Sequence, residues 1–197
     1  MARPLEFDRE VVLEQCMLQF WENGYDKTSI SDLEEVSGLK RTSLYNSFDS
    51  KDGLFKSVIE YFIETKCAYW TNILLKPDCF VTGVDNLMST MIRENFDAKY
   101  PTGCLITYSA AGIDNYSQQI SDAIRQGHEI TFRGLKTAIR KAIKAGNLRT
   151  DTKVDALALF VLNNFQGTMV LSKTIGTKTS LRHVKETVLD AIRLHQD

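Results

Sequence analysis

The side chains best suited to chemistry lie in one short segment, LKRTSLYNSFDSK, from Leu39 to Lys51. It combines hydroxyl, amide and basic side chains with two apolar residues, Leu44 and Phe48, four positions apart. If residues 41–48 form a helix, this spacing directs the apolar pair inward and leaves the polar side chains outside. Amide and hydroxyl groups can bond to base edges in a major groove, and basic groups can contact phosphates. The segment therefore predicts a nucleic-acid-binding surface.

Residues typical of catalysis or metal binding form no recognisable motif. The three histidines, His128, His183 and His195, all lie in the C-terminal part, and the four cysteines show no C-x-x-C spacing. The chain contains no phosphate-binding glycine loop, no G-x-S-x-G and no H-E-x-x-H sequence. We therefore expect no enzyme activity, no metal and no cofactor.

Helical periodicity surrounds the polar segment, and no alternating strand pattern is present. Asp8 is expected to cap a first helix that ends at an Asn-Gly-Tyr sequence, and a second helix ends at Gly38. With residues 41–48 these helices make a tri-helical helix-turn-helix unit. Ser50 is expected to cap a long helix that runs to Leu75, just before a proline.

The charge distribution has to be considered locally, because the formal net charge of the chain is only −1. Residues 1–50, the predicted helix-turn-helix module, contain five Lys or Arg and ten Asp or Glu. The acidic residues lie mostly on the first two predicted helices, and none occurs from Leu39 to Phe48. A local basic surface is therefore expected within an acidic module.

The sequence TSISDLEEVSGLKRTSLYNSFDSKDGLF, residues 28–55, resembles the helix-turn-helix signature of the TetR family of bacterial transcriptional regulators. Its first threonine, turn glycine, Leu-Tyr-x-x-Phe sequence and following lysine stand at matching positions. The resemblance implies an all-α homodimer, with a DNA-binding domain over residues 1–50 and a ligand-binding and dimerisation domain over residues 51–197. It also implies double-stranded operator DNA as a partner, contacted by Thr28, Lys40, Arg41, Thr42, Ser43, Tyr45, Asn46 and Lys51.

The C-terminal part contains five further expected helices, over residues 82–98, 104–113, 117–145, 152–173 and 180–196. The fourth is apolar on nearly every side, which requires either a deep core or a partner chain. With the last helix it is expected to form a four-helix interface with a second copy. The predicted interface residues are Leu157, Val161, Phe165, Gly167, Val184, Val188 and Ile192. Packing of both helices within one chain is the alternative.

An aromatic and sulfur-rich interior in this part predicts a pocket for an unidentified small-molecule inducer. The candidate lining residues are Phe62, Tyr69, Trp70, Met88, Met91, Phe96, Cys104, Tyr108, His128, Phe132, Asn163 and Phe165. Aromatic residues at helical spacing are more often core than pocket, and a lone histidine is more often hydrogen-bonded within a core. Pocket lining and core packing therefore both stay open for these residues.

Cys104 follows a Pro-Thr-Gly break and opens a predicted helix. The partial positive charge at a helix N-terminus can stabilise a thiolate, which makes Cys104 the best candidate for a reactive thiol. The alternative is that Cys104 is a small apolar residue that fills space in the core.

These features predict a ligand-responsive dimeric repressor that binds a palindromic operator. One alternative is a repressor that senses electrophiles or oxidants through Cys104, and another is a dimeric helical adaptor without DNA binding. The longest apolar run, residues 156–162, is too short to span a membrane, and the N-terminus has no apolar signal core. We therefore expect a cytoplasmic protein without a membrane partner.

Overall fold

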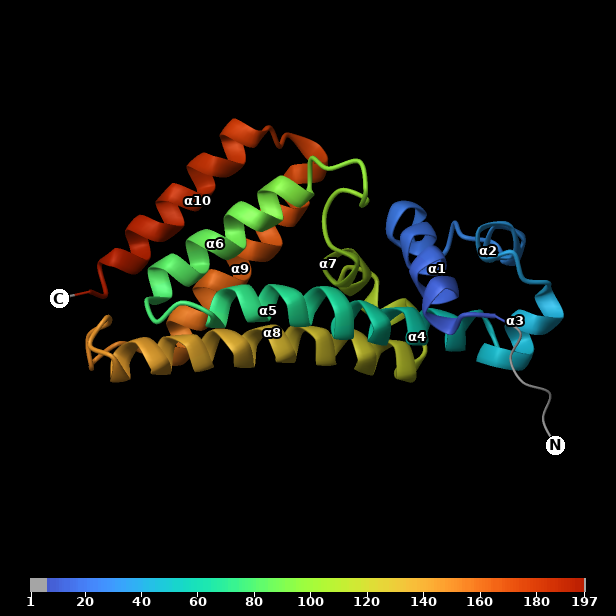
Figure 1. Cartoon of the computed structure of the whole chain (residues 1–197), viewed down its shortest axis with the longest axis horizontal. Helices are drawn as coiled ribbons and strands as arrows, with labels where there is room; N and C mark the ends of the chain where they lie inside the picture. Colours follow the sequence, from blue (N-terminus) through green and yellow to red (C-terminus); the bar gives the residue numbers. More distant parts are fainter. Residues whose placement is uncertain (1–6, 197) are drawn as a thin grey trace.

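The computed structural model describes residues 7–196, which are helical without any strand, as the sequence predicted. Three short helices gather at one end of the molecule (Figure 1): α1 (Arg9–Asn23), α2 (Ile30–Ser37) and α3 (Arg41–Phe48). From them α4 (Lys51–Phe62) leads away, and a π-helical turn (Ile63–Cys67) continues it into α5 (Ala68–Leu75). The long helix expected after Ser50 is thus present, with a π-helical turn near its middle.

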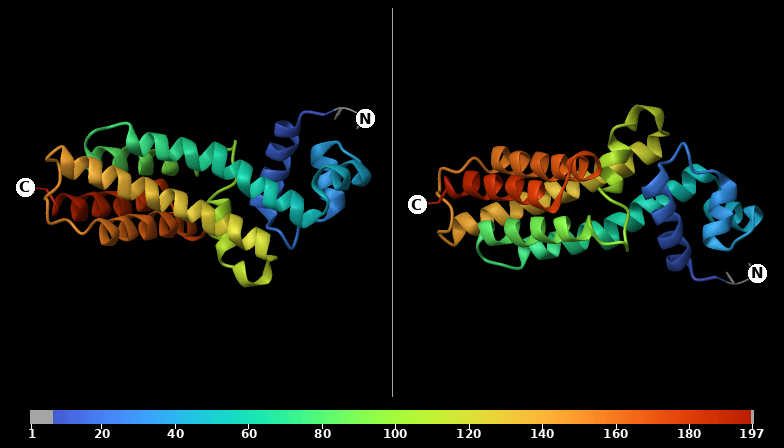
Figure 2. Two further views of the ribbon diagram at one scale, coloured as in Figure 1. Left: turned by 90° about the horizontal axis from the view of Figure 1, so that it is seen from below. Right: turned by 90° about the horizontal axis from the view of Figure 1, so that it is seen from above.

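The rest of the chain forms a bundle of α6 (Phe80–Glu94), α7 (Leu105–Ala110), a 3₁₀ turn (Ile113–Asn115), α8 (Gln118–Lys144), α9 (Val154–Thr174) and α10 (Lys178–Arg193). α8 packs along α4 and α5, while α6, α9 and α10 pack together on the other side. Both views of Figure 2 show the three-helix unit and the bundle at opposite ends of an elongated molecule. The five expected C-terminal helices are all present, with ends displaced by up to four residues.

Local sequence explains where the first helices begin and end. Asp8 accepts hydrogen bonds from two backbone N–H groups in the first turn of α1, as expected of a helix cap. Ser29 and Asp32 bond reciprocally at the start of α2, and Gly38 ends that helix with φ of 68°. Ser50 accepts a backbone N–H in the first turn of α4. These caps fix where α1, α2 and α4 begin, and Gly38 begins the short turn between α2 and α3.

An aromatic cluster joins the three-helix unit to the bundle. The ring of Phe55 on α4 lies 4.7 Å from that of Phe20 on α1 and 5.0 Å from that of Tyr25, measured between centroids. Tyr116, which precedes α8, lies edge-on to Tyr25 at 5.5 Å and tilted against Phe55 at 5.8 Å. The connection between α7 and α8 is therefore in direct contact with the three-helix unit.

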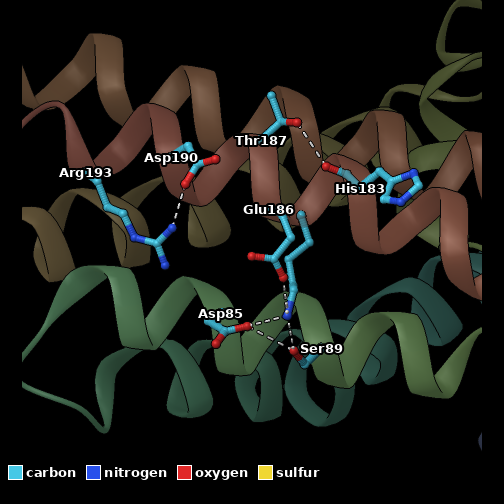
Figure 3. Close-up of polar contacts among 8 residues, drawn as sticks. Asp85, Ser89, His183, Glu186, Thr187, Asp190 and Arg193 are labelled. Atoms are coloured by element: carbon cyan, nitrogen blue, oxygen red, sulfur yellow. Dashed lines mark hydrogen bonds and ion pairs between the residues drawn. The ribbon is translucent and has the colours of Figure 1, made fainter.

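A polar cluster fastens α10 to α6 across the surface of the bundle. Figure 3 shows Asp85 and Ser89 of α6 facing Glu186 of α10. The Nζ atom of Lys185 lies 2.7 Å from Asp85 Oδ1, 3.2 Å from Ser89 Oγ and 3.3 Å from Glu186 Oε1. The Lys185 side chain is only 14% exposed, so these partners replace the water that would otherwise stabilise its charge.

Among the described residues, α9 is the one helix that is long and apolar enough to cross a membrane by length and composition alone. A core helix of a bundle passes the same test, and α9 packs against α7, α8 and α10. Only 33% of its most apolar stretch is buried, however. The helix therefore has an apolar outer face as well as an apolar inner face.

Candidate DNA-binding surface and ligand cavity

α3 presents the polar face that the spacing predicted. Leu44 and Phe48 are 1% and 4% exposed and hold α3 against the rest of the unit. Lys40, Arg41, Thr42 and Asn46 are exposed, and Ser43 and Tyr45 are partly exposed. Six of the eight predicted DNA-contacting residues therefore lie together on or just before one short helix.

Arg41 and Tyr45 form a pair on this face. The Arg41 Nη2 atom lies 3.3 Å from the Tyr45 hydroxyl, and the guanidinium carbon lies 5.3 Å from the ring centroid. The backbone N–H of Arg41 donates to Glu34 Oε1 at 2.8 Å, so a side chain of α2 caps α3. The sequence pattern did not predict this cap, because the contact depends on how the turn at Gly38 places one helix against the other.

Thr28 is the one predicted DNA-contacting residue that the structure places inside the protein. Its exposed fraction is 0%, and its hydroxyl donates to the Gly24 carbonyl at 2.7 Å. The expected phosphate contact through this side chain is therefore corrected, because the turn between α1 and α2 buries the hydroxyl and already uses its proton.

Lys51 lies in the first turn of α4, partly buried, with its Nζ atom 4.1 Å from the ring centroid of Tyr25. The Tyr25 hydroxyl donates a hydrogen bond to the Asp52 carboxylate. Burial, and then this carboxylate, raise the pKa of Tyr25, so its hydroxyl stays protonated as a donor. The aromatic ring therefore holds the Lys51 ammonium in place.

Arg9 adds a cation that the sequence pattern did not assign to this surface. Its guanidinium carbon lies 4.5 Å from the ring centroid of Phe48, at the end of α3. The first turn of α1 and the last turn of α3 are distant in sequence and meet only after folding. No spacing rule could therefore have found Arg9.

A cavity lies inside the bundle between α5, α6, α7, α8 and α9. Five of the twelve predicted pocket residues line it: Trp70, Met91, Cys104, His128 and Phe165. Its polar lining also includes Gln166, which the sequence offered as a possible polar group of the pocket, and Thr71, Thr107 and Thr131, which the prediction missed. None of the described residues that line the cavity is charged.

The other seven predicted pocket residues lie outside this cavity, so their assignment to it is corrected. Phe62 and Met88 are fully buried elsewhere in the core, whereas Tyr69 and Phe96 are 44% and 40% exposed. Tyr108 donates to the Met169 carbonyl at 2.9 Å, Phe132 lies under the Lys136 ammonium, and Asn163 is exposed on α9. Helical spacing gives the apolar face of each helix, but not which part of that face borders empty space.

The predicted dimer residues divide into two groups. Leu157, Val161, Phe165, Val188 and Ile192 are at most 4% exposed within the single chain. They belong to its own core and have almost no surface to offer a second copy, which corrects their assignment, while Val184 is only partly buried. At Gly167, by contrast, an added Cβ would meet no atom within 4 Å. The exposed side chains on its side of α9 are Ala156, Leu159, Phe160, Asn163 and Val170.

Cys104 immediately precedes α7 and is 7% exposed. Burial raises the pKa of the Cys104 thiol, and hydrogen bonds at the helix start oppose that effect without cancelling it. The structure therefore favours the packing interpretation. At Cys79, which precedes α6, partial burial also opposes ionisation, but hydrogen bonds from Thr82 and Val81 outweigh it and lower the pKa.

The fold and the exposed polar face of α3 define a helix-turn-helix protein with an attached helical domain that encloses a cavity. Residues 12–58 match the bacterial regulatory proteins of the tetR family, and residues 81–188 match the tetracyclin repressor-like C-terminal domain. The chain therefore belongs to the TetR family of transcriptional regulators. It is a helix-turn-helix transcriptional regulator of that family and not an enzyme.

Individual relatives cover nearly the whole chain. The transcriptional repressor ComR of Escherichia coli is 27% identical over 192 residues, which span 95% of this chain and 90% of ComR. The repressor DhaR of a Mycobacterium species is 23% identical and spans 93% and 91%. A cysteine mutant of the TetR regulator CifR, solved with 26-base-pair double-strand operator DNA, superposes with a TM-score of 0.86. That structure is 27% identical and covers 96% of this chain and 99% of CifR.

Proposed function

We propose that this chain represses transcription as a homodimer that binds a palindromic double-stranded operator, and that a small molecule in the bundle cavity weakens that binding. The proposal of DNA binding rests on the outer face of α3. Six polar or basic side chains lie on or just before this helix, and the buried Leu44 and Phe48 anchor it to the rest of the unit. A repressor acts where its operator DNA lies, so we place this chain in the cytoplasm.

The side chains of α3 suit different parts of a major groove. Asn46 is exposed on the last turn, and an amide group can form a bidentate pair with an adenine edge. Lys40 and Arg41 lie at the start of α3 and Lys51 lies at the start of α4, where a phosphate backbone would pass. Arg9 supports the same role from α1.

Homodimerisation is supported by the outer face of α9. Leu159, Phe160 and Val170 are 55%, 40% and 46% exposed, and Gly167 on the same side of the helix leaves room for close approach. A second copy packed on this face would cover the apolar side chains and relate two α3 helices by a two-fold axis. Two such helices read half-sites roughly 34–36 Å apart.

Ligand control is supported by the position of α7 and α8. Both helices supply residues to the cavity wall, and Tyr116 between them packs on Tyr25 and Phe55 near the DNA-binding unit. A ligand that prefers a shifted position of α7 or α8 would therefore displace the three-helix unit through Tyr116. The change in operator affinity that the ligand causes is limited by the difference between its affinities for the operator-binding state and the shifted state.

Retardation of the DNA upstream of the protein's own gene tests DNA binding, and it separates a repressor from a helical adaptor that does not bind DNA. Asn46→Ala is expected to weaken binding by roughly 1–3 kcal/mol at the preferred sequence and to relax base preference at one position of each half-site. Asn86→Ala on the exposed surface of α6 is the matched control. If Asn46→Ala and Asn86→Ala behave alike on all base variants, Asn46 does not read the operator.

A further inference from the structure

Among the described residues that line the bundle cavity, one has a fully buried polar atom without a hydrogen-bond partner. His128 Nε2 is fully buried and has no hydrogen-bond partner among the described residues, and His128 lines the cavity from α8. Two other atoms share this condition in the described part of the chain, Trp21 Nε1 and Thr152 Oγ1, but neither residue lines this cavity. Buried polar atoms are normally paired, so the exception at His128 calls for a partner that the protein itself does not supply.

The remaining lining restricts what that partner can be. All the described lining residues are uncharged, and burial of an unpaired charge among them would be strongly unfavourable. The indole N–H of Trp70 already donates to Glu94 Oε2 at 3.0 Å, so Trp70 offers the cavity only its ring. The Thr131 hydroxyl donates to the Gly127 carbonyl at 3.2 Å within α8. A ligand would therefore meet a mainly apolar surface with a few uncharged polar groups, which are the His128 imidazole and the side chains of Thr71, Thr107 and Gln166.

The cavity also limits ligand size. Its volume, counted for the centres of water-sized spheres, is about 50 Å³. The volume that the spheres themselves fill is larger than the volume open to their centres, so the cavity accommodates several waters or a small ligand in their place. This space suits a single small ring or a short chain rather than an extended or polycyclic molecule.

The hydrogen-bonding capacity of a neutral imidazole limits which polar group the ligand can carry. Burial lowers the pKa of His128, so the ring is neutral near pH 7 and carries one donor and one acceptor nitrogen. A hydroxyl group can both donate and accept, so it satisfies Nε2 in either tautomer. A carbonyl satisfies only the protonated nitrogen, and a carboxylate adds a charge that the cavity does not compensate.

We infer that the ligand of this cavity is a small uncharged molecule with one hydroxyl group on an apolar body, a simple phenol or alcohol, whose hydroxyl pairs with His128 Nε2. This assignment rests on the proposed function, because it gives a chemical class to the inducer of the same cavity. His128 acts as the residue that orients the ligand and selects the hydroxyl.

Phenol and toluene provide a matched test, because they have the same size and differ by a hydroxyl in place of a methyl group. Their dissociation constants for the full-length protein can be measured by ligand-observed NMR. In His128→Leu, the preference for phenol over toluene is expected to fall about three- to tenfold, the usual worth of one hydrogen bond. His183→Leu is the matched control, because His183 is exposed on α10 (Figure 3) and is not among the residues that line the cavity.

An unchanged phenol preference in His128→Leu, or the absence of millimolar binding by both compounds to the parent protein, would overturn the inference. A second readout needs no variant: phenol should shift the Nε2 resonance of His128 more than toluene does, and equal shifts would also overturn it. Operator release is measured on the same samples. Phenol that binds through His128 without releasing operator would support the assigned chemistry and refute ligand-controlled repression.

Discussion

Removal of the Lys40 ammonium should change the salt dependence of operator binding by an amount that the proposed symmetry fixes. Lys40 is exposed immediately before α3, and no ion pair or ring contact engages its side chain within residues 7–196. Each phosphate contact contributes about 0.9 to the log–log slope of affinity against salt. Because a homodimer carries two copies, Lys40→Ala should lower the slope by about 1.8.

The expected difference in salt dependence between Lys40→Ala and the parent protein is large enough to measure by fluorescence anisotropy on a labelled operator. Between 50 and 200 mM salt, the parent protein should lose roughly twelvefold more affinity than the variant, which is fourfold raised to the power of about 1.8. Lys144→Ala removes the same charge from the exposed end of α8, far from α3, and serves as control (Figure 1). Equal slopes for Lys40→Ala and the parent protein would refute a phosphate contact at Lys40. A slope lowered by only about 0.9 would contradict two equivalent reading heads.

Three further outcomes are expected. Gly167→Leu should convert dimer to monomer in sedimentation without loss of helicity by circular dichroism, because a Cβ added at Gly167 meets no atom of its own chain within 4 Å; a dimer that persists would place the interface elsewhere. Cys79 should react first with a maleimide in mass-spectrometric labelling, since its pKa is lowered while burial raises that of Cys104; faster labelling of Cys104 would contradict this order. Partial burial opposes ionisation of Asp85, but the hydrogen bond and charge of Lys185 outweigh it and lower the pKa of Asp85. The stability that this lowered pKa contributes is present above the usual carboxyl pKa and is lost as pH falls below about 4. Lys185→Met should therefore reduce the pH dependence of the free energy of urea unfolding by at most about 1 kcal/mol. Identical pH profiles of variant and parent would show that the pair contributes nothing.

The sequence by itself determined the helices of the DNA-binding unit and the outer polar face of α3. Helix caps, apolar spacing and turn glycines act over a few residues, so Asp8, Gly38, Ser50 and the Leu44–Phe48 pair could be assigned from local rules. The TetR signature of residues 28–55 is equally local, and the match to the family confirmed it. Local rules of this kind do not require knowledge of how distant helices meet.

Tertiary structure decided which residues share a site and which side of a helix is already covered. The buried hydroxyl of Thr28, the Arg9 cation over Phe48 and the cap from Glu34 to Arg41 all depend on contacts between separate helices. In the bundle, α9 is apolar on nearly all sides, so its sequence could not distinguish the buried Val161 from the exposed Phe160 next to it. Packing fills one apolar face and leaves another open, and the physical difference lies in the neighbouring helices rather than in the side chains themselves.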